Sequence, residues 1–304
     1  MIVGPTASGK TELACMLAPE INGEIISVDA RQCYKRIDTG TAKPDHRQMK
    51  RVPHYNISVL ELEEKDSVVA FLKRAEAWKD IIMRKGKSVL YAGGSTLHLQ
   101  SLIQPIDNVP GPDQDNLAEL KLKAERDGLD SLFRKLKKAD PVYAGTMDGL
   151  NRHRIMRALD VWMQSGRPFS SFHRHREFSL PEDLVVYGLC HPRRILHQRI
   201  NSRVDRMIDN GLVEETRQLL REGYPPTLQS LQTVGYRDVI DYLNSGLSRD
   251  RMIDNIKTQT RRYAKRQITW FRRWPFIRWL NADELSLESM IREISGEPVP
   301  GQSH

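Results

Sequence analysis

The stretch "GPTASGKT" near the start of the chain restricts the possible folds more than any other feature of this sequence. It fits the pattern of Gly, four residues, and then Gly-Lys-Ser/Thr, a P-loop whose backbone N–H groups converge on phosphate oxygens. The lysine adds a positive charge, and the Thr11 hydroxyl is suited to Mg²⁺. A diphosphate fits such a loop as well as ATP does. We therefore predict a phosphate site formed by Gly4, Pro5, Thr6, Ala7, Ser8, Gly9, Lys10 and Thr11.

Strand-like segments alternate with helical segments after the P-loop. "EIISVDA", "SVLYAGGS" and "DLVVYGL" are apolar or β-branched runs that end in turn or polar residues, as is typical of buried parallel strands. A helical pattern such as residues 66–86, which stops at Gly86, lies between them. This order predicts an α/β fold, an open parallel sheet of the P-loop NTPase type with helices on both faces. Ligands bind such sheets at the carboxyl ends of the strands.

The pattern changes between residues 112 and 175. This stretch has no strand-like run, reads as successive charge-rich amphipathic helices, and is flanked by the breaker-rich segments "VPGPD" and "QSGRPFSSF". We predict a small all-helical insertion domain at residues 112–175, within a discontinuous P-loop catalytic core of residues 1–111 and 176–304. The core is expected to resume at a strand near Leu184, and the final "GEPVPGQSH" to be a frayed tail.

The composition predicts a cytoplasmic protein with no membrane partner. The chain has no apolar run of transmembrane length and no signal-peptide pattern. Its three cysteines are far apart and form no C-x-x-C motif, so we expect reduced thiols rather than disulfides or a zinc site. The "HRH" at His173 and His175 has no acidic or thiol partner at ligand spacing and is interpreted as a solvated loop. We expect a monomer.

The positive charge of the chain is concentrated near its end. The net charge is +8, and residues 256–273 hold seven Lys and Arg residues with no acidic residue. On a helix, Lys257, Arg261 and Lys265 would form one stripe, with Ile256, Tyr263, Ala264 and Phe271 on another side. A solvated helix face usually mixes both signs, so this pattern favours binding to the phosphates of a nucleic acid.

Asp29 ends the second predicted strand, so its carboxylate should face the P-loop. The residue could be a metal ligand of an NTPase, a helix N-cap, or a general base that acts on an acceptor beside the phosphates. Its position alone does not distinguish these roles. The following residues Gln32 and Tyr34 offer hydrogen-bonding and stacking groups suited to a purine, and a Gly-Thr turn then carries Lys43.

Seven blocks in one order resemble the bacterial tRNA dimethylallyltransferase family, from about Ile2 to Leu280. They are "GPTASGKT", "ISVDARQCYKRIDTGTAKP", "YAGGSTLHL", "RIMRALDV", "LHQRINSRVDRMIDNGLVEE", "VGYRDVIDYL" and "TRRYAKRQITWF". The resemblance implies transfer of a dimethylallyl group from dimethylallyl diphosphate to the exocyclic amine of the adenosine immediately 3′ of the anticodon. The implied cofactor is Mg²⁺ near Thr11, and the implied partner is the anticodon stem-loop of tRNA.

The resemblance also implies roles for single residues. Asp29 matches the catalytic base, Arg203 matches a diphosphate-binding arginine, and Ser95 matches a position that contacts the flipped nucleotide or its neighbours. We therefore expect Asp29, Ser95 and Arg203 to be catalytic. The residues expected to bind tRNA are Asp29, Ala30, Arg31, Gln32, His153, Arg154, Ile155, Met156, Arg157, Lys257, Arg261 and Lys265.

The sequence departs from the family pattern at four places. Ala30 stands where a serine follows the catalytic aspartate, and Ser95 and His98 stand where threonine and tyrosine are usual. "LNR" at residues 150–152 replaces the usual Asn-Asp-Pro, and only three residues precede Gly4. Lys10, Thr11, Asp29 and Arg203 are all present, so activity is still expected.

Three other functions remain alternatives on the sequence. A prenyltransferase that acts on free AMP, ADP or ATP would share the P-loop and Asp29, but it would need neither the all-basic helix nor the helical insertion. A P-loop kinase or NTPase would use Asp29 as a metal ligand. An RNA-binding protein without activity would bind tRNA and yield no product.

Overall fold

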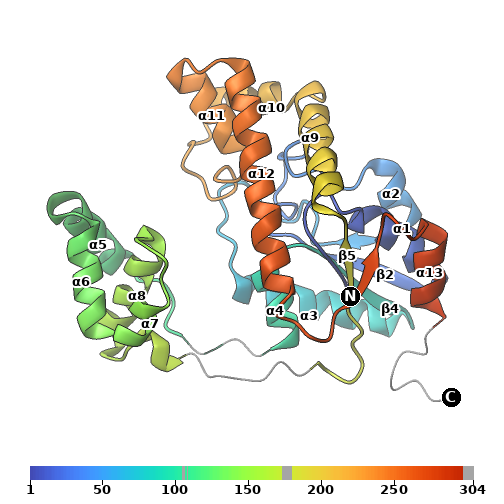
Figure 1. The fold of residues 1–304 in the computed structure, drawn as a ribbon, viewed down its shortest axis with the longest axis horizontal. Helices are drawn as coiled ribbons and strands as arrows, with labels where there is room; N and C mark the ends of the chain where they lie inside the picture. Colours follow the sequence, from blue (N-terminus) through green and yellow to red (C-terminus); the bar gives the residue numbers. More distant parts are fainter. Residues whose placement is uncertain (105–106, 108, 173–179, 297–304) are drawn as a thin grey trace. The chain divides into compact units, whose positions relative to one another are not determined.

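The computed structural model describes residues 1–104, 107, 109–172 and 180–296 (Figure 1). The chain divides into two compact units, one of Met1–Gln104 with Phe178–His304 and one of Pro105–Glu177. The second unit includes the segment just before residue 112 because α8 (Arg152–Ser165) binds it. Gln164 Nε2 donates to Gly111 O at 2.8 Å, and Arg157 donates to Pro110 O.

The first unit contains a parallel sheet in the order β3-β2-β4-β1-β5-β6. Its strands are β1 (Ile2–Val3), β2 (Gly23–Val28), β3 (His54–Tyr55), β4 (Ser88–Gly93), β5 (Tyr187–Cys190) and β6 (Arg278–Asn281). The predicted α/β class is confirmed. The strand expected near Leu184 begins three residues later, at Tyr187. The sequence did not indicate the edge strands β3, which is only two residues long, and β6, whose Arg278 and Trp279 are exposed.

Helices cover both faces of this sheet, as predicted (Figure 1). Ile2 packs on one face with residues of α1 (Lys10–Glu20) and α13 (Leu287–Ser295). The next residue, Val3, packs on the other face with α3 (Val68–Arg84) and α4 (Thr96–Ile103). Because successive side chains of a strand point to opposite faces, these short apolar strands serve two cores. The predicted stop of α3 is present, with Gly86 at φ 68°.

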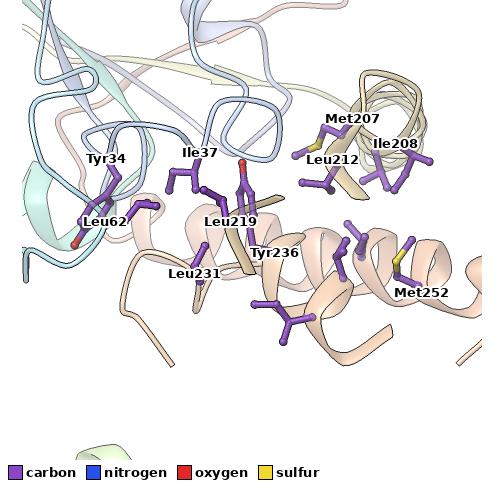
Figure 2. Packing of buried hydrophobic residues seen from close by; sticks show 14 of the residues in the cluster. Tyr34, Ile37, Leu62, Met207, Ile208, Leu212, Leu219, Leu231, Tyr236 and Met252 are labelled. Carbon is purple, nitrogen blue, oxygen red and sulfur yellow. The ribbon is translucent and has the colours of Figure 1, made fainter. Parts of the chain in front are cut away.

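A third core joins the loop after β2 to the C-terminal helices of this unit (Figure 2). The helices are α9 (Arg193–Asp209), α10 (Leu212–Arg221), α11 (Tyr236–Ser245) and α12 (Arg249–Phe271). Tyr34 is fully buried in this core, where its hydroxyl donates to Gln229 Oε1 at 3.3 Å. The expectation that Tyr34 stacks on a purine is therefore wrong, because the ring packs inside the protein.

The second unit is helical throughout its described residues. It contains α5 (Gln114–Asp127), α6 (Leu129–Ala139), α7 (Pro141–Gly145), α8 and a 3₁₀ turn at Phe169–Phe172. Leu120, Leu136, Ile155 and Leu159 form its core, and each is fully buried. The side chain of Ile155 thus packs inside the unit, where it is not available to RNA.

The cysteines remain thiols, as expected. Cys15, Cys33 and Cys190 are free, and burial raises the pKa of Cys15 to about 11 and that of Cys33 to about 12. Among the described residues, no helix is long and apolar enough to cross a membrane. His173, His175 and the predicted tail at residues 297–304 lie outside the described residues.

Candidate active site

A cavity of about 840 Å³ lies at the carboxyl ends of β1, β2 and β4. Of the residues expected at the site, Thr6 to Thr11, Asp29, Gln32 and Arg203 line it. Gly4, Pro5, Ala30, Arg31 and Ser95 are not part of the lining. The cavity is also lined by polar and aromatic residues that the sequence analysis did not assign to the site; among them are Thr39, Arg199, Arg206, Tyr263 and Gln267.

The P-loop has the backbone shape that its two glycines allow. Gly4 has φ 152°, and a Cβ there would lie 2.9 Å from the Leu189 carbonyl oxygen, so a side chain would not fit. Gly9 has φ 97° and precedes α1, which starts without a side-chain cap. The N–H groups of the first helical turn therefore remain free to bind an anion, and the helix dipole favours one there.

Gln267 of α12 fixes the loop from behind. Its Oε1 accepts a hydrogen bond from the Thr6 N–H at 2.9 Å, and its Nε2 donates to Gly94 O at 2.7 Å. The side chain is almost fully buried. Gln267 thus ties the P-loop to the end of β4, and the Thr6 N–H is already used within the protein.

Lys10 is a half-buried cation that forms no ion pair with any described residue. Its ammonium donates to the Pro5 carbonyl at 2.7 Å. Burial lowers the pKa of Lys10 from 10.5 to about 7, Arg203 lowers it further, and Asp29 partly opposes both effects. An anion that entered the cavity would stabilise the charged form of this lysine.

Three arginines of α9 face the same cavity at one-turn spacing. Arg199 Nε donates to Ala7 O at 2.8 Å, a terminal nitrogen of Arg203 lies 3.4 Å from Thr41 O, and Arg206 Nε lies 3.3 Å from Ser202 O. These partners are all neutral carbonyls, and no carboxylate within the described residues forms an ion pair with these arginines. Burial lowers the pKa of Arg203, while Asp29 raises it. The positive charge of this wall is therefore largely uncompensated.

Asp29 uses one carboxylate oxygen and leaves the other open. Oδ1 accepts from the backbone N–H of Arg31 at 2.8 Å and of Gln32 at 3.2 Å. The next residues form a turn rather than a helix, so Asp29 caps a turn and not a helix N-terminus. In the part of the chain that the structure describes, Oδ2 has no hydrogen-bond partner, which leaves it free to accept a proton or bind a cation.

Gln32 and Ser95 are held by neighbours of Asp29. Gln32 accepts from Ser27 Oγ at 2.9 Å and donates to Ala42 O at 3.1 Å, so its amide already organises the loop after β2. The Ser95 N–H donates to Val28 O at 3.2 Å, which places Ser95 beside the residue that precedes Asp29. Its hydroxyl lies 2.7 Å from His98 Nδ1.

The expected cationic stripe of α12 is divided by its packing on α9. Lys257 pairs with Asp205 at 2.6 Å, and Arg261 donates to Asn201 Oδ1 at 2.9 Å. Lys265 is exposed, as are Arg262 and Arg266. Tyr263, which was grouped with the apolar side, instead lines the cavity.

Two of the expected tRNA-binding residues on α8 are exposed. His153 and Arg154 lie on the surface, with the Arg154 guanidinium 5.9 Å from the centre of the Tyr143 ring. Met156 is half-buried against the core of the unit. Arg157 donates to the fully buried Asp160 Oδ2 at 2.6 Å. The Arg157 charge is therefore compensated inside its own unit.

The residues around the P-loop fit a magnesium ion that is held mainly by phosphates. The described residues contain no group of three or more His, Cys, Asp or Glu side chains that could hold a metal alone. Mg²⁺ commonly binds through phosphate oxygens, waters and one or two protein oxygens. The Thr11 hydroxyl at the cavity wall suits this type of binding.

The parallel sheet and the P-loop define a protein of the P-loop class, and the cationic cavity is suited to a polyphosphate. The family model described as IPP transferase matches residues 32–274, and the chain belongs to this family. The tRNA dimethylallyltransferase of Geobacter metallireducens is 41% identical over 281 residues, which cover 92% of this chain and 91% of that protein. The tRNA dimethylallyltransferase of Carboxydothermus hydrogenoformans is 40% identical over 299 residues, which cover 98% of this chain and 96% of that protein.

Solved structures agree with this family. The tRNA delta(2)-isopentenylpyrophosphate transferase of Staphylococcus epidermidis superposes with a TM-score of 0.71 at 36% identity, over 97% of this chain and 96% of that one. A eukaryotic dimethylallyltransferase that acts on tRNA gives a TM-score of 0.78 at 25% identity, over 99% of this chain and 80% of that one. These relatives favour neither the free-adenylate enzyme nor the kinase.

Proposed function

We propose that this protein transfers a dimethylallyl group from dimethylallyl diphosphate to the exocyclic amine of the adenosine immediately 3′ of the tRNA anticodon, with release of diphosphate. The main observation behind the proposal is how charge is distributed over the walls of the cavity. One wall holds uncompensated cations, and the wall at the end of β2 holds the free oxygen of Asp29. A group transfer between an anionic donor and an amine acceptor needs these two features.

The P-loop and α9 would bind the donor. The allylic C–O bond breaks as negative charge builds on the leaving diphosphate, and preorganised cations and N–H groups stabilise that charge. Lys10, Arg199 and Arg203 are suited to this role because their present partners are neutral carbonyls. Arginine can also bind phosphate through two parallel N–H groups. A magnesium ion near Thr11 would add charge neutralisation to the diphosphate.

Asp29 would accept the proton from the acceptor. The exocyclic amine of adenine is a poor nucleophile because its lone pair is delocalised into the ring, so a base must remove a proton as the C–N bond forms. The free Oδ2 of Asp29 is the carboxylate oxygen suited to this step. The amine is unreachable while its base is stacked, so the nucleotide must be flipped into the cavity.

The exposed cations of the chain would attract the anticodon stem-loop. On α12 these are Arg262, Lys265 and Arg266, and on α8 the exposed cation is Arg154, with the exposed His153 next to it in the sequence as a hydrogen-bonding group. We keep Lys257, Arg261 and Arg157 as weaker candidates, because each already has a partner within the protein. Ala30 and Arg31 follow Asp29 and would lie beside the flipped nucleotide. We propose that the enzyme acts as a monomer in the cytoplasm, where its tRNA substrate is found.

Mass spectrometry of nucleosides tests the proposal. An unmodified anticodon stem-loop would be incubated with the protein, Mg²⁺ and dimethylallyl diphosphate, beside reactions with free AMP and with ATP alone. The expected result is a gain of one prenyl mass on the loop adenosine. A prenylated AMP without modified RNA would identify the free-adenylate enzyme, and consumption of ATP alone would identify a kinase or NTPase.

A further inference from the structure

Among the described residues that line the cavity, Tyr263 of α12 alone exposes a large apolar side chain. The other apolar lining residues larger than alanine are Ile25, Pro44 and Met207, and all three are buried. Tyr263 is 36% exposed. The rest of the described lining is polar, charged or small. A hydrocarbon group in this cavity therefore has Tyr263 as its main apolar contact.

Tyr263 is close to both of the groups that would hold the two substrates. One turn further along α12, Gln267 accepts a hydrogen bond from the Thr6 N–H of the P-loop, so this face of the helix is turned toward the phosphate site. Burial raises the pKa of Tyr263, Asp29 raises it further, and Arg203 is among the arginines that lower it. The phenol is thus within electrostatic reach of the base on one wall and of a diphosphate-binding arginine on the other.

The ring of Tyr263, rather than its hydroxyl, is the part suited to the substrates. The guanidinium carbon of Arg266 lies 5.7 Å from the ring centre, a cation–π contact that already shows the ring next to positive charge. A hydroxyl donor would add little at the diphosphate, because Lys10 and the arginines of α9 face it. A hydroxyl that donated to Asp29 would make that carboxylate a weaker base. The dimethylallyl group, in contrast, has no other large apolar surface among the described lining residues.

We propose that the aromatic ring of Tyr263 covers the dimethylallyl group and stabilises the positive charge that develops on it during transfer. This inference rests on the proposed function. The electron pair of the allylic C–O bond leaves with the diphosphate, the amine lone pair forms the new C–N bond, and the amine proton passes to Asp29. While the C–O bond is breaking, the allyl group carries positive charge. The face of an aromatic ring is negative, so it attracts this charge.

The same ring would keep water from the allyl group. If water attacks the allylic carbon in place of the amine, its oxygen forms the new C–O bond, its proton goes to the solvent, and dimethylallyl alcohol is released with diphosphate. A large apolar side chain over the allyl group excludes water from this position. Tyr263 would therefore affect both the rate of transfer and the fraction of the donor that is lost to hydrolysis.

Three variants separate the hydroxyl, the aromatic face and the bulk of this side chain. Tyr263→Phe removes the hydroxyl and should leave kcat on the stem-loop within about threefold. Tyr263→Leu also removes the aromatic face and should lower kcat about tenfold, with little change in KM for the donor, because a neutral allyl group packs equally well on leucine. Tyr263→Ala should in addition release more dimethylallyl alcohol per prenyl group transferred. A loss in Tyr263→Phe as large as that in Tyr263→Leu, or an unchanged kcat in Tyr263→Leu, would overturn the inference.

Binding of inorganic diphosphate with Mg²⁺ is the control for these variants. The ring is proposed to contact the hydrocarbon part of the donor, so all three variants should bind diphosphate with the Kd of the wild type, and thermal melts check that each is folded. Weaker diphosphate binding by folded Tyr263→Phe and Tyr263→Leu would place the residue in the phosphate site and overturn the inference.

A series of fluorinated phenylalanines at position 263 tests the charge effect with almost no change of shape. Each fluorine withdraws electron density from the face of the ring and so weakens its attraction for a cation. In the full-length protein, kcat should fall stepwise from phenylalanine through its mono-, di- and trifluorinated forms. A kcat that does not depend on fluorination would overturn the inference while the wild-type protein still prenylates RNA. A wild-type protein that fails to prenylate RNA would instead refute the proposed function.

Discussion

The two units of this protein hold the same types of charged residue in opposite states. In the cavity of the first unit, Arg203 has only a carbonyl partner, and Asp29 keeps one oxygen free. In the second unit, Arg157 donates to Asp160, whose carboxylate also accepts from Gln164 at 2.7 Å. Uncompensated buried charge is costly and is stabilised by a ligand of opposite sign, whereas an internal pair stabilises its own fold. The comparison therefore separates substrate-binding charges from structural ones.

The largest difference in kcat is expected between variants of Asp29 and variants of Asp160. Asp29→Asn should lower kcat by about 10² to 10⁴-fold, because an amide cannot accept the proton of the amine, while stem-loop binding persists. Asp160→Asn should leave kcat within about threefold and lower thermal stability instead, since it weakens the pair with Arg157. Transfer assays and melting curves measure both. Turnover that survives in Asp29→Asn, together with lost RNA binding, would contradict the assignment of Asp29 as the base.

Variants of Arg203 and Arg157 should give the next largest difference, in kcat/KM for the donor. Arg203→Gln should lower kcat/KM for dimethylallyl diphosphate by about 10² to 10³-fold, the cost of removing one group that stabilises charge in the transition state. Initial rates across donor concentrations at saturating stem-loop measure this loss. Arg157→Gln is the matched control and should change kcat/KM for the donor by less than about threefold. Equal losses in both variants would remove the distinction between open and paired arginines.

A stability measurement on Arg157 sharpens the comparison. Arg157→Gln leaves the carboxylate of Asp160 without its cation, and the expected loss is about 1–3 kcal/mol of unfolding free energy. Urea unfolding followed by circular dichroism would report it, with the exposed neighbour Arg154→Gln as the control, for which a change below about 0.5 kcal/mol is expected. A larger loss for Arg154 than for Arg157 would be inconsistent with the observed pairing.

Lys10 should lower the stability of the free protein, because its charge is placed to bind an anion. Its pKa falls from 10.5 in the unfolded chain to about 7 on folding, so the unfolded chain binds more protons between these values. The destabilisation from burying the charge is complete below about pH 7 and is lost as the pH rises toward 10.5. Lys10→Met should therefore raise Tm at pH 6–7, by about 2–4 °C per kcal/mol, with a smaller gain at pH 9. A lower Tm at pH 6–7 would contradict the half-buried, unpaired state of this lysine.

The smallest effect concerns the salt dependence of RNA binding. Each phosphate contact contributes roughly 0.7 to 0.9 to the slope of log affinity against log salt. Lys265→Ala should reduce the slope by about one such contact, because Lys265 is exposed. Lys257→Ala should change it less, because Lys257 pairs with Asp205. Filter binding of the stem-loop at several salt concentrations measures both slopes, and the reverse order would mean that the pair with Asp205 opens on RNA.

The sequence predicted the parts of the fold and site that depend on local pattern. The P-loop, the buried strands and Asp29 at the end of β2 follow from short motifs and hydrophobic periodicity. The edge strand β6 was not predicted, because its pairing with β5 depends on residues about ninety positions apart. Tyr34 was misassigned because nothing in its local sequence indicates burial under α10 and α11.

Charge partners were the least predictable part of the site. Helical spacing placed Lys257, Arg261 and Lys265 on one stripe, but only their packing on α9 separates the paired Lys257 from the exposed Lys265. Arg199 and Gln267 join the P-loop from positions about 190 and 260 residues away. The one-turn spacing of Arg199, Arg203 and Arg206 was the signal that could have identified this wall.

Calorimetric titration of inorganic diphosphate with Mg²⁺ tests the central claim most directly, with the wild-type protein beside Arg203→Gln and Arg157→Gln. The account predicts that the wild type and Arg157→Gln bind diphosphate with similar Kd, and that Arg203→Gln binds it at least about tenfold more weakly. Equal binding by all three proteins, or a loss confined to Arg157→Gln, would contradict the claim that the open charges of the cavity form the diphosphate site.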